Sequence, residues 1–137
     1  MTSSTAIFWP MLAQVLLTYV VYALMSSRRI GAVKAGVARP SDFKVPSTDP
    51  EPSATAARNL TNQFELPVLF FAACLSLFVT GGAGMAAVVA AWAFVLARVA
   101  HAWVHVTSNR IKIRRMLFTL GLLVNLVQWL LLAVHIA

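Results

Sequence analysis

The chain has 137 residues, of which 60% are hydrophobic and only 11% are charged, and its formal net charge is +7. A soluble domain carries about 25% charged residues, so this chain has too little polar material to cover a surface that faces water. Its single cysteine, Cys74, excludes an internal disulfide and a metal site built from cysteines. We therefore expect one membrane-embedded domain that spans residues 1–137.

Four apolar runs predict four membrane-spanning helices, approximately at residues 7–25, 60–80, 85–106 and 116–136. A membrane-spanning helix needs about 20 mostly apolar residues, and each run is long enough. Within lipid a helix satisfies its own backbone hydrogen bonds, which open strands cannot do. The first run lacks a preceding basic segment, so we read it as a retained helix and not as a signal peptide. The expected fold is an all-α integral membrane protein, a bundle of four transmembrane helices.

The connections between these runs differ in length and in charge. Residues 26–57 form a long polar connection, whose proline-containing part from Val45 to Ala56 we expect to be an irregular cover over one membrane face. Residues 80–84 (TGGAG) are a tight turn, and residues 107–115 (TSNRIKIRR) are short and basic. Almost every Lys and Arg lies in or beside the first and third connections. Basic loops mark the cytoplasmic side, so both termini are expected on the opposite side. Because topology accounts for the basic residues, we expect no nucleic-acid partner.

Polar side chains recur on one face of two predicted helices. Arg58, Asn62 and Glu65 follow an i, i+4, i+7 spacing, and Arg98, His101 and His105 follow i, i+3, i+7. Both sets lie near the cytoplasmic end of their helices. Arginines of the two basic connections enter or leave the bilayer at the same level: Arg28, Arg29, Arg114 and Arg115.

Two interpretations of these polar residues compete. In the first, Glu65 closes one structural ion pair and the basic side chains extend to lipid phosphates; we favour this for Arg28, Arg29, Arg39 and Lys44. In the second, they form a binding site, which we favour for a second set. That set is Arg58, Asn62, Glu65, Arg98, His101 and Arg114. Its surplus of positive charge predicts an anion, and a peptide with two carboxylates and one amine fits, because arginine binds carboxylates with two hydrogen bonds.

The order of these residues resembles the MAPEG family, the membrane-associated proteins in eicosanoid and glutathione metabolism. The resemblance rests on Arg58-x3-Asn62-x2-Glu65-x-Pro67, then Arg98-x2-His101-x3-His105, then Arg110-x3-Arg114. It covers nearly the whole chain and is greatest to the small bacterial branch. It implies a homotrimer, a location in the bacterial inner membrane with both termini periplasmic, and glutathione bound near the cytoplasmic face between subunits.

The resemblance also implies roles for individual residues. Arg114 matches the arginine that stabilises the glutathione thiolate and is the catalytic candidate. The implied glutathione-binding residues are Arg28 (or Arg29), Arg58, Asn62, Glu65, Arg98, His101, His105, Arg110 and Arg115. His105 and Phe118 stand where several members carry tyrosine, and Thr61 where some carry a second arginine. No metal site is expected, because His135 is far from the other histidines.

Three functions remain open at this stage. The first is a glutathione-dependent transferase or peroxidase that acts on a lipophilic substrate from the bilayer, with Arg114 lowering the pKa of the thiol. The second is a non-catalytic lipid-binding or scaffold subunit, which the missing tyrosines favour. The third is a proton-coupled transporter built around Glu65. Gln14, Asn125 and Gln128 are expected to join helices, the last two facing the first helix or a neighbouring subunit.

Overall fold

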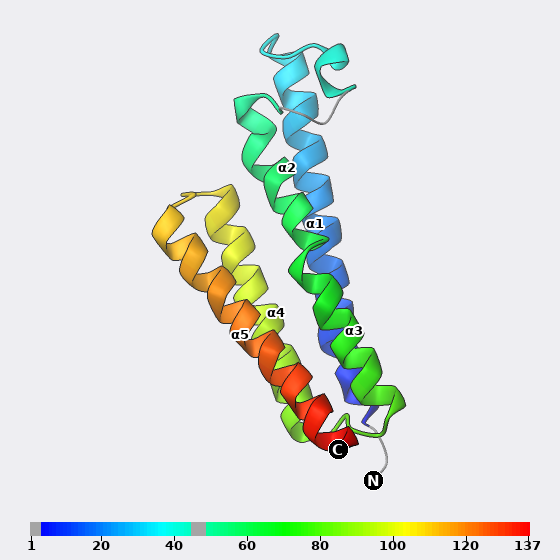
Figure 1. The fold of residues 1–137 in the computed structure, drawn as a ribbon. Coiled ribbons are helices and arrows are strands. Elements are labelled where there is room, and N and C mark those ends of the chain that lie inside the picture. The colour runs from blue at the N-terminus through cyan, green and yellow to red at the C-terminus, as the bar shows by residue number, and fades with distance from the viewer. Residues whose placement is uncertain (1–3, 45–48) are drawn as a thin grey trace.

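The computed structural model describes residues 4–44 and 49–137, and Figure 1 shows that this part of the chain is a bundle of long helices. The helices are α1 (Phe8–Lys34), α2 (Glu51–Gln63), α3 (Leu66–Val79), α4 (Met85–Val106) and α5 (Ile111–Ile136). Two short 3₁₀ turns, η1 (Thr5–Ile7) and η2 (Pro40–Phe43), precede α1 and follow it. Four helical segments are long and apolar enough to cross a membrane, with α2 and α3 together forming one of them. The expected all-α, four-span membrane fold is confirmed.

The start of η1 and the C-terminus lie at the end of the bundle that also carries the turn between α3 and α4 (Figure 1). Two hydrogen-bonding contacts tie the chain ends to this turn. The Ser4 amide donates to the Ala83 carbonyl at 3.0 Å, and His135 Nε2 lies 2.9 Å from the Thr80 carbonyl oxygen. The basic connections are at the opposite end, so the polar chemistry of the chain is concentrated there.

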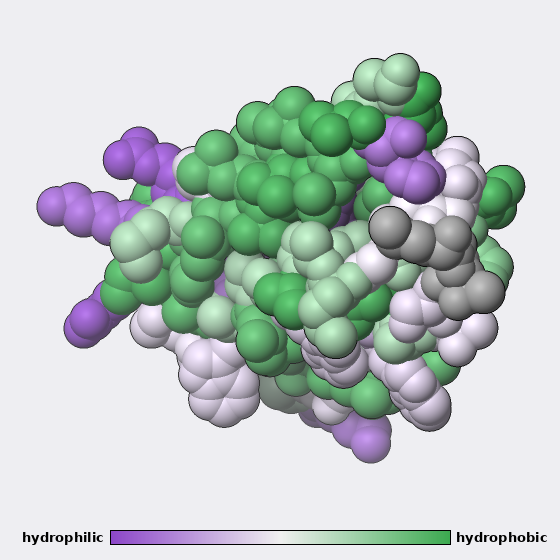
Figure 2. Space-filling model, turned by 90° about the horizontal axis from the view of Figure 1, so that it is seen from below, coloured by the Kyte–Doolittle hydropathy of each residue, from purple (hydrophilic) through white to green (hydrophobic). Residues whose placement is uncertain are grey.

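The core is built from small and aromatic side chains. Phe70 of α3 stacks on Phe94 of α4, with ring centroids 4.4 Å apart and nearly parallel planes. Ala87 and Ala91 are buried on α4, and their small side chains allow neighbouring helices to approach closely. Large hydrophobic residues are exposed along the outer faces, and green hydrophobic residues dominate the end view of Figure 2. Lipid, not water, is the solvent that suits such a surface.

Helix α1 is longer than expected. The apolar pattern predicts an end near residue 25, but the helix continues to Lys34 through Ser26, Ser27 and two arginines. It ends where Gly36 adopts a left-handed conformation (φ 72°), which glycine does without steric cost. The Val37 amide donates to the Ala32 carbonyl and the Gly36 amide to that of Val33, the hydrogen-bond pattern of a Schellman cap.

The expected continuous helix over 60–80 is wrong, and so is the irregular connection that was to run to residue 57. Helix α2 begins at Glu51 with Pro52 in its first turn, where a missing amide hydrogen is tolerated. It ends at Gln63, and α3 starts at Leu66. Pro67 explains the break, because its ring clashes with the carbonyl four residues earlier, that of Gln63, and offers it no hydrogen. Residues 45–48 of the predicted cover lie outside the described part.

The last two runs lie close to their expected positions. The bounds of α4 coincide with the predicted run over 85–106. Helix α5 starts at Ile111, five residues before the expected position, so the basic stretch around Arg114 is helical. Helices α4 and α5 pack closely along their length and form one wall of the bundle, and α1 with α2 and α3 forms the other (Figure 1).

Candidate functional site

Two adjoining hollows open between α2 and the α4–α5 pair, at the basic end of the bundle. The first, of about 400 Å³, is lined by Ala54, Thr55, Arg58, Asn62, His105, Asn109 and Arg114. The second, of about 300 Å³, is lined by Asn62, Glu65, His101, Ile111, Arg114, Arg115 and Phe118. They share Asn62 and Arg114, and we call the two together the basic groove. Volumes of about 300–1,000 Å³ are typical of small-molecule sites.

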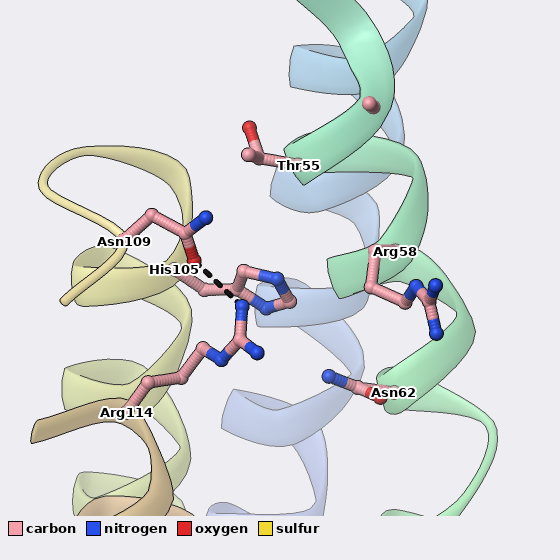
Figure 3. A pocket seen from close by; sticks show the side chains of 7 residues that line it. Thr55, Arg58, Asn62, His105, Asn109 and Arg114 are labelled. Atoms are coloured by element: carbon pink, nitrogen blue, oxygen red, sulfur yellow. Dashed lines mark hydrogen bonds between the residues drawn. The ribbon is translucent and has the colours of Figure 1, made fainter. Parts of the chain in front are cut away.

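A hydrogen bond to the turn between α4 and α5 holds the Arg114 side chain in place. Its Nη1 donates to Asn109 Oδ1 at 2.6 Å, and Figure 3 shows this bond beside the ring of His105. Asn109 has a positive φ of 47°, which asparagine tolerates better than most residues, and this turn directs its side chain toward α5. No carboxylate in the described part lies within ion-pair distance of Arg114. Its charge is therefore available to an anion.

The two histidines of α4 form the floor between the hollows. His101 and His105 are buried, with 1% and 2% of their surface exposed, and their rings meet edge to face at 5.5 Å. The centroids of the His101 and Phe118 rings are 5.8 Å apart. The Nδ1 atoms of both rings are buried without a hydrogen-bond partner. Buried polar atoms are seldom left unpaired, so these two atoms favour a polar ligand.

Arg98 was expected to line the binding site, but its side chain lies behind the groove. Its side chain is completely buried behind the groove and lines neither hollow. Nη2 donates to the Asn62 carbonyl at 2.9 Å, and the guanidinium lies 5.8 Å from the centre of the Phe118 ring. The Asn62 carbonyl is in the last turn of α2, where a cation is favoured by the helix dipole and by unpaired carbonyls. Arg98 therefore fixes the helix end that presents Asn62, while its Nε and Nη1 lack partners.

Glu65 lines the second hollow from the break between α2 and α3. It is exposed, and no cation in the described part lies within 4 Å of its carboxylate. The structural ion pair considered for Glu65 is thus absent from these residues. The ion pair that is present joins Arg29 and Asp49, with Arg29 Nη2 2.7 Å from Asp49 Oδ1. This pair lowers the pKa of Asp49, chiefly through the hydrogen bond from the guanidinium.

Arg28 and Arg29 point to different neighbours. Arg28 donates to Thr55 Oγ1 at 2.9 Å and to the Val106 carbonyl at 2.7 Å, so it joins α1 to α2 and to the end of α4. Thr55 lines the first hollow, so Arg28 is the one of the two that adjoins the groove. Arg29 is engaged by Asp49 and lies against the Phe43 ring.

The remaining predicted arginines surround the groove unevenly. Arg58 lines the first hollow, although Figure 3 shows its side chain turned away from Arg114 along α2. Arg115 lines the second hollow. Arg110 is the residue that precedes α5; it is exposed and lines neither hollow.

A buried chain of amides on a neighbouring face of α2 was not predicted. Gln14 Nε2 donates to Gln63 Oε1 at 2.9 Å, Gln63 Nε2 to Asn59 Oδ1 at 3.0 Å, and Asn59 Nδ2 to the Ala102 carbonyl at 3.3 Å. This amide chain joins α1, α2 and α4 directly behind the groove. The i, i+4 spacing of Asn59 and Gln63 on a helix is the signal that would have indicated it.

Gln14 and Gln128 join helices as expected, but the direction predicted for α5 is wrong. Gln128 Nε2 lies 3.4 Å from Cys74 Sγ on α3, and Asn125 Nδ2 donates to Gln128 Oε1 at 3.2 Å. These side chains are therefore satisfied within one chain, toward α3 and not α1. Polar groups in lipid favour such pairing because hydrocarbon offers no alternative partner.

The geometry defines a multi-pass α-helical membrane protein with a groove lined by basic and polar side chains at one end of its bundle. Charged groups in membrane-spanning helices usually face the bundle interior and mark a functional site. The model of the MAPEG family matches residues 7–134, nearly the full length, and the chain belongs to this family. Searches among curated proteins and among solved structures find no match.

Proposed function

We propose that the chain is a glutathione-dependent transferase or peroxidase that acts on a lipophilic substrate. Members of the family commonly use glutathione, and its two carboxylates suit a groove in which several guanidinium groups face one carboxylate. The observation that carries the proposal is the position of Arg114, which lines both hollows and has no acidic partner in the described part.

The chemistry follows from that position. A thiol with a pKa of about 8.5 is mostly protonated at neutral pH, while the thiolate is the nucleophile. A guanidinium fixed beside the sulfur favours the charged form, and each unit of pKa shift corresponds to about 1.36 kcal/mol. The thiolate then attacks an electrophilic carbon or a peroxide oxygen. In the carbon case a thioether forms as the leaving group departs. In the peroxide case the sulfur takes one oxygen to become a sulfenic acid as the O–O bond breaks, and the other oxygen leaves as the alcohol after taking up a proton. The thiol of a second glutathione then displaces water from the sulfenic acid to give the disulfide.

In this proposal each of the other groove residues binds a different group of the ligand. Asn62 adjoins both hollows and offers an amide to a peptide carboxylate or carbonyl. Glu65 is the one acidic residue of the groove and suits the ligand amine. His101 and His105 each present an unpaired ring nitrogen to polar groups. His105 stands where several members of the family carry tyrosine, and its ring would supply the hydrogen bond that the phenol gives there.

Assembly and orientation complete the proposal. We propose a homotrimer, in which a neighbouring subunit covers the open side of the groove. The basic end of the bundle would face the cytoplasm and both termini the periplasm, because basic loops are retained inside. Cysteine accessibility labelling at Ser108 and at Gly84 would test the orientation, since the two positions lie at opposite ends of the bundle.

Isothermal titration of the detergent-solubilised protein with glutathione, together with ultraviolet absorbance of the bound thiolate, tests the proposal. We expect binding with a thiolate signal at neutral pH. Arg114→Ala should remove that signal, whereas Lys112→Ala, a change of an exposed basic residue of α5 that lines neither hollow, should preserve it. Lack of binding at millimolar glutathione, or equal losses in the two variants, would refute the assignment.

A non-catalytic lipid-binding subunit is the second candidate. Phe118 favours it, because an aromatic ring without a hydroxyl lines the second hollow and gives it an apolar wall. This candidate predicts that a fatty acid binds in the groove and that glutathione produces no thiolate signal. Competition between a fatty acid and glutathione for one site, measured by titration, separates the two.

A further inference from the structure

A third hollow lies apart from the basic groove, between the end of α1 and the turn η2. It has a volume of about 370 Å³ and is lined by Arg29, Ile30, Val33, Lys34, Pro40 and Phe43. Its walls are almost entirely apolar, and two of its lining residues, Arg29 and Lys34, are cations. We infer that this hollow binds an anionic glycerophospholipid, with the upper acyl chain against Ile30 and Val33 and the phosphate beside Lys34.

The depth of the hollow in the membrane supports this assignment. Helix α1 has 27 residues and is therefore about 40 Å long, whereas the hydrocarbon layer is about 30 Å thick. Trp9 is exposed at the far end of α1, where an interfacial tryptophan is expected. About 20 residues from there the hydrocarbon ends, near Arg28. The segment from Arg29 to Lys34 then lies at the level of the lipid headgroups, where the glycerol backbone and the first methylene groups of a lipid can cover its apolar surface.

The charges around the hollow select an anion. Arg29 is already paired with Asp49, through two hydrogen bonds of 2.9 and 2.7 Å. Asp42 caps its own turn by accepting a bond from the Arg39 amide at 2.8 Å. Lys34 is exposed and has no carboxylate within ion-pair distance in the described part of the chain.

Two further cations, Arg39 and Lys44, belong to the same exposed turn. Basic residues beside a membrane each contribute about 1 kcal/mol to attraction by anionic lipid. The apolar walls distinguish a lipid from a free phosphate, because a phosphate alone would leave the exposed surface of Ile30 uncovered. Ile30 is 55% exposed in the chain, and an acyl chain would cover it.

Native mass spectrometry of the full chain in mild detergent tests this inference, with titrations of dioleoylphosphatidylglycerol and dioleoylphosphatidylcholine. We expect the anionic lipid to bind more tightly, and Lys34→Gln to weaken its binding about fivefold, the equivalent of about 1 kcal/mol. Lys112→Gln, a change of an exposed lysine at the start of α5, is the matched control and should leave binding unchanged. Val33→Trp fills the hollow without altering charge and should weaken both lipids.

Three results would overturn the inference. The first is equal binding of the two lipids by the unmodified chain. The second is an equal effect of Lys34→Gln and Lys112→Gln, which would indicate general attraction to charge. The third is displacement of the lipid by an equal concentration of glycerol 3-phosphate, which would indicate a soluble phosphate as the ligand. Glutathione binding is read separately, so failure here leaves the proposed function of the groove standing.

Discussion

The polar side chains on two neighbouring faces of α2 differ in whether they have hydrogen-bond or ion-pair partners within the chain. On the inner face, Asn59 and Gln63 are buried and bonded to each other, and they continue to Gln14 and to α4. On the outer face, Arg58 and Asn62 line a hollow whose cations have no acidic partner in the described residues. The inner groups are neutral and are bonded to one another and to a backbone carbonyl, and only Gln14 Oε1 among these amide atoms is buried without a partner. The outer groups are charged and open, an arrangement that favours a ligand.

The largest expected effect is on ligand binding at the outer face. Asn62→Ala removes an amide that adjoins both hollows, and a hydrogen bond to a charged group is worth about 1.5–3 kcal/mol. Glutathione affinity should fall about 10- to 100-fold with little change in melting temperature. Titration calorimetry and thermal denaturation in the same detergent measure the two quantities. A large loss of stability with unchanged glutathione affinity would instead show that Asn62 holds helices together and does not bind the ligand.

Gln63→Leu makes the corresponding change on the inner face. It leaves Gln14 Nε2 and Asn59 Oδ1 buried without their partner, and each unsatisfied buried group costs about 1–3 kcal/mol. We expect a clear decrease in the free energy of unfolding, measured by chemical denaturation in mixed micelles. Thr61→Val is the control, because its hydroxyl bonds only to its own helix and is exposed. If the two variants were equally stable, the amide chain would not hold the helices together.

A substitution of Arg28 tests whether this cation, like the buried amides, stabilises the fold by joining helices. It bonds to two neutral acceptors on different helices, which lysine cannot match with a single ammonium in the same geometry. Arg28→Lys should therefore cost about 0.5–1.5 kcal/mol, the value of one hydrogen bond. The expected decrease in melting temperature should come without loss of glutathione affinity. A selective loss of affinity would instead place Arg28 among the ligand contacts.

The smallest expected effect is that of pH on the Arg29–Asp49 pair. The folded state lowers the pKa of Asp49, so the pair stabilises the fold above the unfolded value of about 3.9. This contribution is lost as pH falls through the lower, folded pKa. The pair is partly exposed, so about 0.2–1 kcal/mol is involved. The stability difference between the unmodified chain and Asp49→Asn should shrink between pH 6 and pH 3. A difference that is constant with pH would contradict this assignment.

The membrane spans could be predicted because length and hydropathy decide them. The bounds of α4 agree with the apolar run, since this helix lies wholly in one solvent. The extension of α1 and the existence of α2 were missed for the opposite reason. There the chain leaves the hydrocarbon, and helix ends depend on Gly36, Pro52 and Pro67 and on side-chain hydrogen bonds.

For the candidate site, the sequence indicated several residues that line the groove but not the directions of their side chains. Helical spacing and the family pattern indicated Asn62, Glu65 and Arg114, which line the groove. The direction of the Arg98 side chain depends on the helix break after Gln63. This break leaves the Asn62 carbonyl free to accept the hydrogen bond from Arg98. The amide chain joins Gln14 to a residue 49 positions away, so no local pattern links the two.

The shortness of α3 sets the depth of the groove in the bilayer. Its 14 residues rise about 21 Å, so about 9 Å of the hydrocarbon thickness is left for the last turns of α2. Asn62 and Glu65 then lie level with the upper segments of the acyl chains, below the headgroups. The proposed lipophilic substrate would reach this level through the leaflet, without first crossing into water.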